Sequence, residues 1–178
     1  MAEQTLPLLL EPEQLVTALQ QAKAPLLLVD VCSKEEYASG HVPGAAHLKP
    51  ALLQSGVKPT VGKLPEIARL RALFSSLGLQ PDNHVVAMDH EGGGWAARLL
   101  WTLDVIGHKN YSYLNGGTRA WKAAGLVTSV KDYTSETTKY AFTIDEAPIA
   151  HLADITKRLE DPGFAIWDTR SAEEYSGE

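Results

Sequence analysis

The chain of 178 residues is 44% hydrophobic and 21% charged, a composition typical of a globular protein that can bury a core. Its formal net charge of −6 comes without any basic cluster, which argues against nucleic acid or an anionic membrane surface as a partner. A single cysteine excludes a disulfide within the chain, and the N-terminal residues lack the features of a signal peptide, so we expect a cytoplasmic protein.

Helices and strands are predicted to alternate from residue 11 onward. Apolar residues recur with a helical period over 11–23, and the run Leu26–Val31 is typical of a strand buried on both faces of a parallel sheet. Short or amphipathic helices are expected at 33–40, 65–78, 95–106 and 118–124, and further strands at 45–48, 84–89 and 111–114. This order predicts an open, mostly parallel α/β domain over residues 8–128.

The alternating pattern fades after this first domain. Residues 129–148 are rich in threonine, serine and charge and hold few large apolar residues, as expected of an interdomain linker. A helix is then expected at 149–159 and a strand at 164–168. Because this is again the order found at the start of the chain, residues 149–178 are predicted to begin a second domain that is incomplete here.

The two proposed domains also begin with similar sequences. Residues 29–37 read VDVCSKEEY and residues 167–175 read WDTRSAEEY. Each copy contains a capping box, in which a serine and a glutamate three residues later satisfy backbone N–H groups at a helix start. A repeat with a domain-sized period indicates two similar domains in tandem.

These motifs resemble those of a known superfamily. Asp30, the pair EY at 36–37 and GHVPGA at 40–45 resemble the "D-x-R…E-Y-x-x-G-H-I-P-G-A" signature of the rhodanese superfamily. LNGG at 114–117, followed by Trp121, resembles its second landmark. The second copy of the repeat, at 167–175, and the stretch EGGGWAARLLW further resemble tandem-domain thiosulfate sulfurtransferases of bacterial type. The resemblance implies a rhodanese-like open sheet flanked by helices.

The resemblance also implies sulfur-transfer chemistry without a cofactor. In this superfamily a cysteine thiolate takes the sulfane sulfur of thiosulfate and passes it, as a persulfide, to cyanide or another thiophilic acceptor. Such chemistry requires a cysteine of low pKa in a loop whose backbone N–H groups converge before a helix. That loop follows the fourth strand of the active domain.

In this chain Asp89 stands at the position of the family's cysteine. An aspartate cannot carry a persulfide, and together with Glu91 it would repel an anionic donor. The first domain is therefore expected to be the non-catalytic copy, with no catalytic residue of its own, and the catalytic cysteine is expected beyond Glu178. This segment alone is expected to be inactive.

Two residues at equivalent positions of the repeat remain candidates for function. Cys32 occupies the position where the motif places an arginine, and the favoured interpretation is a small residue packed at a strand end. Arg170 occupies the same position in the second copy. By resemblance it would bind the anionic sulfur donor, for which its fork of N–H donors is suited, but a structural pairing with an acidic residue is equally open.

No metal site is expected from the sequence. His41 and His47 lack partners at ligand spacing, and His41 is interpreted as a turn residue hydrogen-bonded within 40–45. The glycines at 92–94 precede a predicted helix but match neither nucleotide-binding fingerprint.

Two functions of different classes follow. The first is part of a thiosulfate:cyanide-type sulfurtransferase, whose partners would be thiosulfate, a thiophilic acceptor and the remainder of the second rhodanese domain. The second is a rhodanese-like binding or regulatory module without catalysis. The second copy of the repeat, at 167–175, favours the enzyme.

Overall fold

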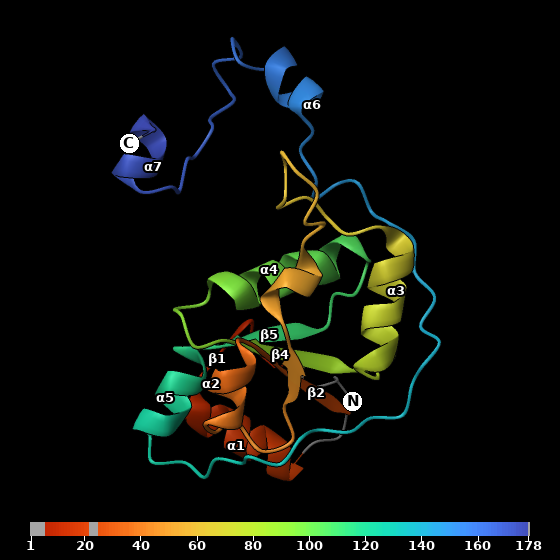
Figure 1. The fold of residues 1–178 in the computed structure, drawn as a ribbon, viewed down its shortest axis with the longest axis vertical. Coiled ribbons are helices and arrows are strands. Elements are labelled where there is room, and N and C mark those ends of the chain that lie inside the picture. Colours follow the sequence, from red (N-terminus) through yellow and green to blue (C-terminus); the bar gives the residue numbers. More distant parts are fainter. Residues whose placement is uncertain (1–5, 22–24, 178) are drawn as a thin grey trace. The chain divides into compact units, whose positions relative to one another are not determined.

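The computed structural model describes residues 6–21 and 25–177. The chain forms two compact units, Met1–Pro148 and Ile149–Glu178, which are described separately (Figure 1). No helix in the described part of the chain combines the length and the apolar character needed to cross a membrane.

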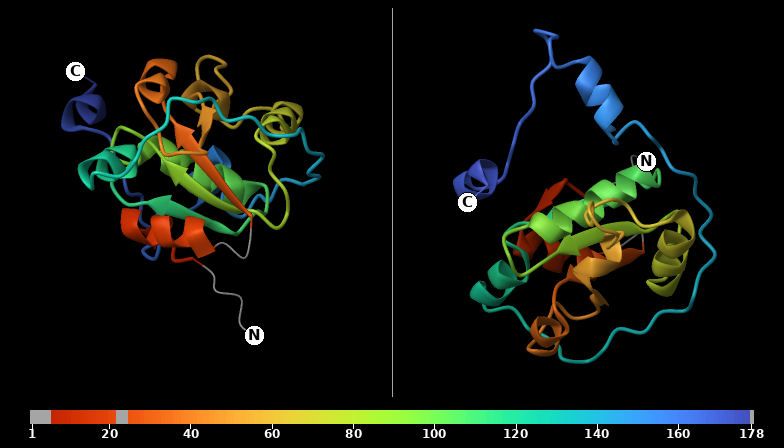
Figure 2. Two further views of the ribbon diagram at one scale, coloured as in Figure 1. Left: turned by 90° about the horizontal axis from the view of Figure 1, so that it is seen from below. Right: turned by 45° about the horizontal axis from the view of Figure 1, so that its top comes forward.

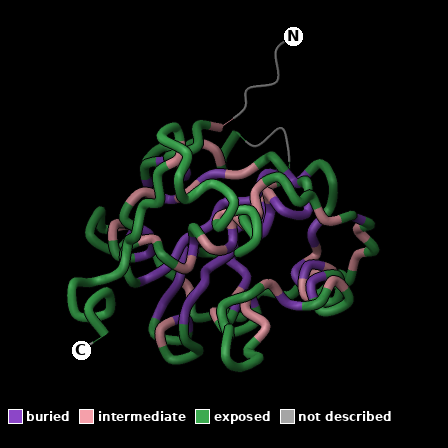
Figure 3. The backbone as a smooth tube through the Cα atoms, turned by 90° about the horizontal axis from the view of Figure 1, so that it is seen from above, coloured by how far each residue is buried: buried purple, intermediate pink, exposed green. Residues whose placement is uncertain are grey.

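The first unit is built on one parallel sheet of five strands. Their order is β1-β5-β4-β2-β3, and all four pairings are parallel. The central strands β2 and β4 are covered on both faces, which explains their continuous apolar sequences (Figure 3). The prediction of a parallel α/β domain is confirmed. The strands span Leu9–Leu10 (β1), Leu26–Val31 (β2), Ala46–Leu48 (β3), His84–Met88 (β4) and Tyr111–Leu114 (β5).

Two hydrophobic clusters hold helices against the sheet. One cluster contains Phe74 and Leu103 from α3 and α4, and the other contains Leu15 and Trp121 from α1 and α5. Each of these four helices therefore contributes its apolar stripe to the core, as amphipathic helices do. The helices of this unit span Pro12–Gln21 (α1), Lys34–Ala38 (α2), Ile67–Ser76 (α3), Gly94–Val105 (α4) and Gly117–Ala123 (α5), with a 3₁₀ turn at Pro50–Leu53 (η1).

Several boundaries differ from those expected. Helix α3 begins two residues later than predicted, because Glu66 has extended backbone angles and acts as the N-cap while Pro65 lies outside the helix. The expected end of the first helix, at 22–23, lies outside the described residues. β1 and η1 were not predicted from the sequence, since a strand of two residues and a single 3₁₀ turn carry no measurable periodicity.

The irregular segment 127–148 packs along the outside of the first unit (Figure 2). Ser129 forms an isolated antiparallel bridge with His41. Further along, Phe142 is buried, its ring meets that of Phe74 edge to face, and its carbonyl accepts a hydrogen bond of 3.0 Å from Arg71. The segment thus contributes to the core without forming a helix or strand. The domain boundaries at 128 and 148 stay predictions.

The second unit contains two short helices, α6 (Leu152–Lys157) and α7 (Ala172–Ser176). Ser171 caps α7, where it accepts a hydrogen bond of 3.2 Å from the Glu174 N–H, as the capping box predicted. Helix α6 is shorter than the predicted 149–159. The expectation of a strand at 164–168 is wrong, because these residues find no neighbouring strand to pair with and the side chain of Trp167 is 89% exposed.

Candidate functional site

The loop that joins β4 to α4 is organised around the carboxylate of Asp89, which is 1% exposed. One oxygen accepts hydrogen bonds from the N–H groups of Glu91 (3.0 Å) and Gly93 (2.9 Å). The other accepts from the N–H groups of Trp95 and Ala96, both at 3.0 Å. Converging N–H groups at a helix start form an anion-binding site. Here the bound anion is the protein's own side chain.

The LNGG motif packs directly against this loop. Gly117 has a φ of 59°, and a Cβ there would collide with the carbonyl oxygen of Asp89. The next residue, Thr118, donates its N–H to the same oxygen at 3.0 Å. This close approach requires glycine and explains why the end of β5 and the end of β4 are held together.

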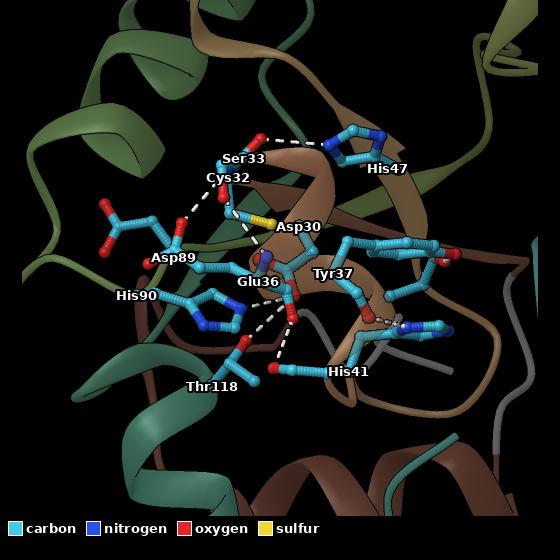
Figure 4. Close-up of polar contacts among 12 residues, drawn as sticks. Asp30, Cys32, Ser33, Glu36, Tyr37, His41, His47, Asp89, His90 and Thr118 are labelled. Atoms are coloured by element: carbon cyan, nitrogen blue, oxygen red, sulfur yellow. Dashed lines mark hydrogen bonds and ion pairs between the residues drawn. The ribbon is translucent and has the colours of Figure 1, made fainter. Parts of the chain in front are cut away.

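Asp30 lies at the end of β2, beside the loop, and is fully buried. Its Oδ2 accepts a hydrogen bond of 3.0 Å from the Thr118 hydroxyl and lies 3.0 Å from Nε2 of His90 (Figure 4). Its Oδ1 has no hydrogen-bond partner within the described residues. The aspartate of the motif thus links β2, the β4–α4 loop and α5.

Cys32 follows Asp30 at the end of β2 and is 3% exposed. Burial, together with the nearby negative charge of Asp30, strongly raises the pKa of the Cys32 thiol. A protonated, buried thiol is a poor nucleophile. The location of Cys32 agrees with the interpretation of a residue packed at a strand end.

The histidines of the motif region have structural partners. The buried ring of His41 stacks on Tyr37, its Nδ1 lies 2.8 Å from the Tyr37 carbonyl oxygen, and its Nε2 lies 3.2 Å from that of Lys131. The expectation that His41 bonds within 40–45 is therefore wrong, since its partners come from α2 and the 127–148 segment. His47 Nε2 lies 2.9 Å from the carbonyl oxygen of Cys32.

Arg170, in the second unit, forms a fork with Asp168. Its Nε lies 3.0 Å and its Nη2 lies 2.7 Å from the Asp168 carboxylate, and Nη1 donates to the carbonyl oxygen of Glu174 at 3.2 Å. These hydrogen bonds lower the pKa of Asp168 to about 2. The pair is exposed to solvent, so its contribution to stability is small. A role for Arg170 in substrate binding stays a prediction.

Two shallow hollows lie near the carboxyl end of the sheet, where open α/β sheets commonly bind ligands. The larger, of about 520 Å³, reaches Cys32, and Trp95 lines both this hollow and the second one, of about 370 Å³. The only thiol of the chain is buried in the wall of the first hollow, and Asp89 is fully occupied by hydrogen bonds. The loop thus forms an anion-binding arrangement around Asp89, and the buried thiol of Cys32 lies outside it.

His90 was not predicted from the sequence as a residue of the site. This residue follows Asp89 in the loop and stands 60 positions from its partner Asp30, so no local spacing connects them. The signal that could have found it is topological, because β2 and β4 are neighbouring parallel strands and their ends must meet at one edge of the sheet.

Comparison with known proteins agrees with this geometry. The chain is 41% identical to a thiosulfate sulfurtransferase of Pseudomonas aeruginosa over 97% of its length and 63% of the relative's. It is also 41% identical to a thiosulfate sulfurtransferase of Azotobacter vinelandii, over 98% of the chain and 64% of the relative. A probable 3-mercaptopyruvate sulfurtransferase of P. aeruginosa is 32% identical over 93% and 64% of the two lengths. The chain thus spans slightly less than two thirds of these relatives.

The fold is shared with solved structures. A 3-mercaptopyruvate sulfotransferase of Escherichia coli superposes with a TM-score of 0.84 over 96% of this chain and 68% of that one, at 19% identity. The rhodanese-like domain family matches residues 11–124, which include the strands β2 to β5, the Asp89 loop and the LNGG motif. On this match and on the identities above, the chain belongs to the rhodanese family.

Proposed function

We propose that this chain is the non-catalytic domain and the beginning of the catalytic domain of a thiosulfate sulfurtransferase. The whole protein would move sulfane sulfur from thiosulfate, through a cysteine persulfide, to cyanide or another thiophilic acceptor. The observation that carries the proposal is the occupied loop: Asp89 stands where the family has its nucleophile and its carboxylate takes all four converging N–H groups.

Three features support inactivity of the first domain. A carboxylate cannot form a persulfide, and its negative charge opposes the approach of thiosulfate. The N–H groups that would stabilise a persulfide anion are already used by Asp89. The thiol of Cys32 is buried and outside this loop. The catalytic cysteine therefore belongs to the remainder of the second domain, as the repeat at 167–175 and the partial coverage of the relatives suggest.

Within the second domain, Arg170 is our candidate for binding the sulfur donor. Asp168 holds the guanidinium by its Nε edge, while N–H groups remain on both terminal nitrogens. A guanidinium fixed in this way presents a planar set of donors to the oxygens of thiosulfate. Replacement of Arg170 by lysine in the whole protein should then raise the KM for thiosulfate more than it lowers kcat.

The proposal is tested by thiocyanate formation from thiosulfate and cyanide. We expect no thiocyanate from the 178-residue chain, and activity when the remainder of the second domain is added as a separate polypeptide. Thiocyanate production by the chain alone that is abolished in Cys32→Ser would overturn the assignment.

The alternative is a binding or regulatory module without catalysis. The occupied Asp89 loop favours this alternative if the whole protein has no second loop at the position of the family's cysteine. The coding sequence after residue 178 distinguishes the two. A further strand that ends in a cysteine supports the enzyme, and a stop codon supports the module.

A further inference from the structure

Three side chains with different donor atoms meet where β2 and β4 end. Asp30 and Cys32 come from the end of β2, and His90 comes from the loop after β4 (Figure 4). One oxygen, one sulfur and one ring nitrogen from these residues all lie within 4.8 Å of one another. All three side chains are buried, with exposed fractions of 0%, 3% and 6%. The sulfur-transfer proposal assigns no catalytic role to any of these three side chains.

The carboxylate of Asp30 is incompletely satisfied in this cluster. Its Oδ2 is bound by Thr118 and His90, but its Oδ1 is buried and has no hydrogen-bond partner within the described residues. A buried acceptor without a hydrogen-bond partner is unfavourable, and more so when it is charged. A carboxylate oxygen of this kind, beside a thiol and an imidazole, fits a cation that binds all three.

We propose that Asp30, Cys32 and His90 bind a Zn²⁺ ion. Sulfur, imidazole nitrogen and carboxylate oxygen are the ligands that zinc takes in proteins, whereas Mg²⁺ and Ca²⁺ require oxygen ligands. On binding, the S–H bond of Cys32 breaks, its proton leaves to solvent, and the thiolate ligates the metal; no oxidation is involved. The carboxylate, the thiolate and a neutral imidazole then balance the two positive charges.

The surroundings hold the ligands in place and leave a route to the site. The Thr118 hydroxyl donates to Asp30 Oδ2, and His47 Nε2 contacts the backbone carbonyl of Cys32, contacts of the kind that orient metal ligands. Cys32 also lines the hollow of about 520 Å³ together with Ser33 and Trp95. Three protein ligands leave the fourth position of a tetrahedral ion to a small molecule.

The test uses the untagged 178-residue chain, kept reduced with a phosphine and stripped of metal with a chelator. Zn²⁺ is titrated in competition with a chromophoric chelator, and Co²⁺ is used as a spectroscopic probe of the ligands. We expect one equivalent of Zn²⁺ to bind and to raise the melting temperature. We also expect the Co²⁺ form to show a thiolate-to-cobalt charge-transfer band in the near ultraviolet.

Two variants assign the ligands. Cys32→Ser should lose the charge-transfer band. Both Cys32→Ser and His90→Asn should weaken Zn²⁺ binding at least about tenfold, since loss of a residue that only hydrogen-bonds to a metal ligand already lowers metal affinity about 10–100-fold. His90→Asn keeps a side-chain donor near Asp30 and serves as the second test variant if Cys32→Ser is unstable. His151→Asn, outside the cluster, serves as the matched control and should bind like the original chain.

The proposal is overturned if the original chain and Cys32→Ser bind Zn²⁺ with equal affinity, or if the Co²⁺ form lacks the charge-transfer band. Neither outcome bears on sulfur transfer, because thiocyanate formation depends on a cysteine in another loop.

Discussion

Four backbone N–H groups depend on one side chain in the β4–α4 loop. Asp89→Ala removes their acceptor, a side chain that is itself almost fully buried. Because hydrogen bonds to a charged group contribute about 1.5–3 kcal/mol each and part of the loss is recovered by water, we expect the free energy of unfolding to fall by at least about 2 kcal/mol. Urea denaturation measures this change.

Glu91→Ala is the matched control for Asp89→Ala. Glu91 carries a carboxylate in the same loop but is exposed, so its removal should change stability by no more than about 0.5 kcal/mol. Equal effects of the two substitutions would show that the Asp89 carboxylate does not organise the loop.

Two buried histidines make stability depend on pH. Burial lowers the pKa of both His84 and His108 below the ordinary value of 6.5, and His84 is also affected by His108. In the unfolded chain these imidazoles bind protons as the pH falls through about 6.5, while in the folded chain they stay neutral to a lower pH. Their contribution is therefore complete above pH 6.5 and is lost as the pH falls toward the folded-state pKa values.

We expect the urea midpoint to decrease between pH 7.5 and pH 5.5, with a smaller decrease in His84→Gln. The glutamine amide can still reach the Ser112 hydroxyl, which lies 2.8 Å from His84 Nε2. Glu36 also makes the fold less stable in acid, because hydrogen bonds at Ser33 lower the pKa of its carboxyl group. Its contribution is lost only as the pH falls below its ordinary pKa of 4.5, outside this pH range. An unchanged pH dependence in His84→Gln would contradict the assignment.

At the scale of elements, the two capping boxes form a matched pair. In α2 the Ser33 hydroxyl accepts from the Glu36 N–H at 3.1 Å, and in α7 Ser171 and Glu174 make the same contact. Ser33→Ala should lower the stability of the first unit by about 1 kcal/mol, the usual cost of an N-cap serine. Ser171→Ala should leave the urea transition of the first unit unchanged. A similar shift in both variants would mean that the two units unfold together.

The sequence predicts elements well where the signal is local. The bounds of β2 and β5 agree with the prediction, because each is a short segment rich in aliphatic or aromatic residues beside turn residues. Residues 164–168 carry a similar apolar run but form no strand, since a strand also needs a partner and the sequence pattern does not supply one. Phe142 was missed for a related reason, as a single buried aromatic residue in an irregular segment has no period.

The candidate site was predictable only in part. Asp89 was located by the resemblance, but the four hydrogen bonds around its carboxylate depend on the fold of its loop. The cluster of Asp30, Cys32 and His90 required the register of two parallel strands, in which Asp30 pairs with Met88 just before the loop that carries His90. Residues distant in sequence meet there through topology, which no local pattern encodes.

At the scale of the whole molecule, the second unit is too small to be stable alone. It holds about thirty residues, fewer than the roughly 40 below which domains usually need disulfides, metals or oligomerisation. Its large apolar side chains are exposed, by 60% for Ile166 and 89% for Trp167. We therefore infer that these side chains are covered when the remainder of the proposed second domain is present.

Limited proteolysis of the 178-residue chain tests this inference. We expect cleavage within 149–177 well before any cut within the sheet of the first unit, because local stability follows the number of buried contacts. Addition of the remaining part of the second domain should slow this cleavage and shift the fluorescence of Trp167 to shorter wavelength as its indole leaves water. The Trp167→Phe variant isolates that signal from the other three tryptophans. If the isolated chain resists protease throughout, or if the added polypeptide changes neither cleavage nor fluorescence, residues 149–178 are not the beginning of a second rhodanese domain.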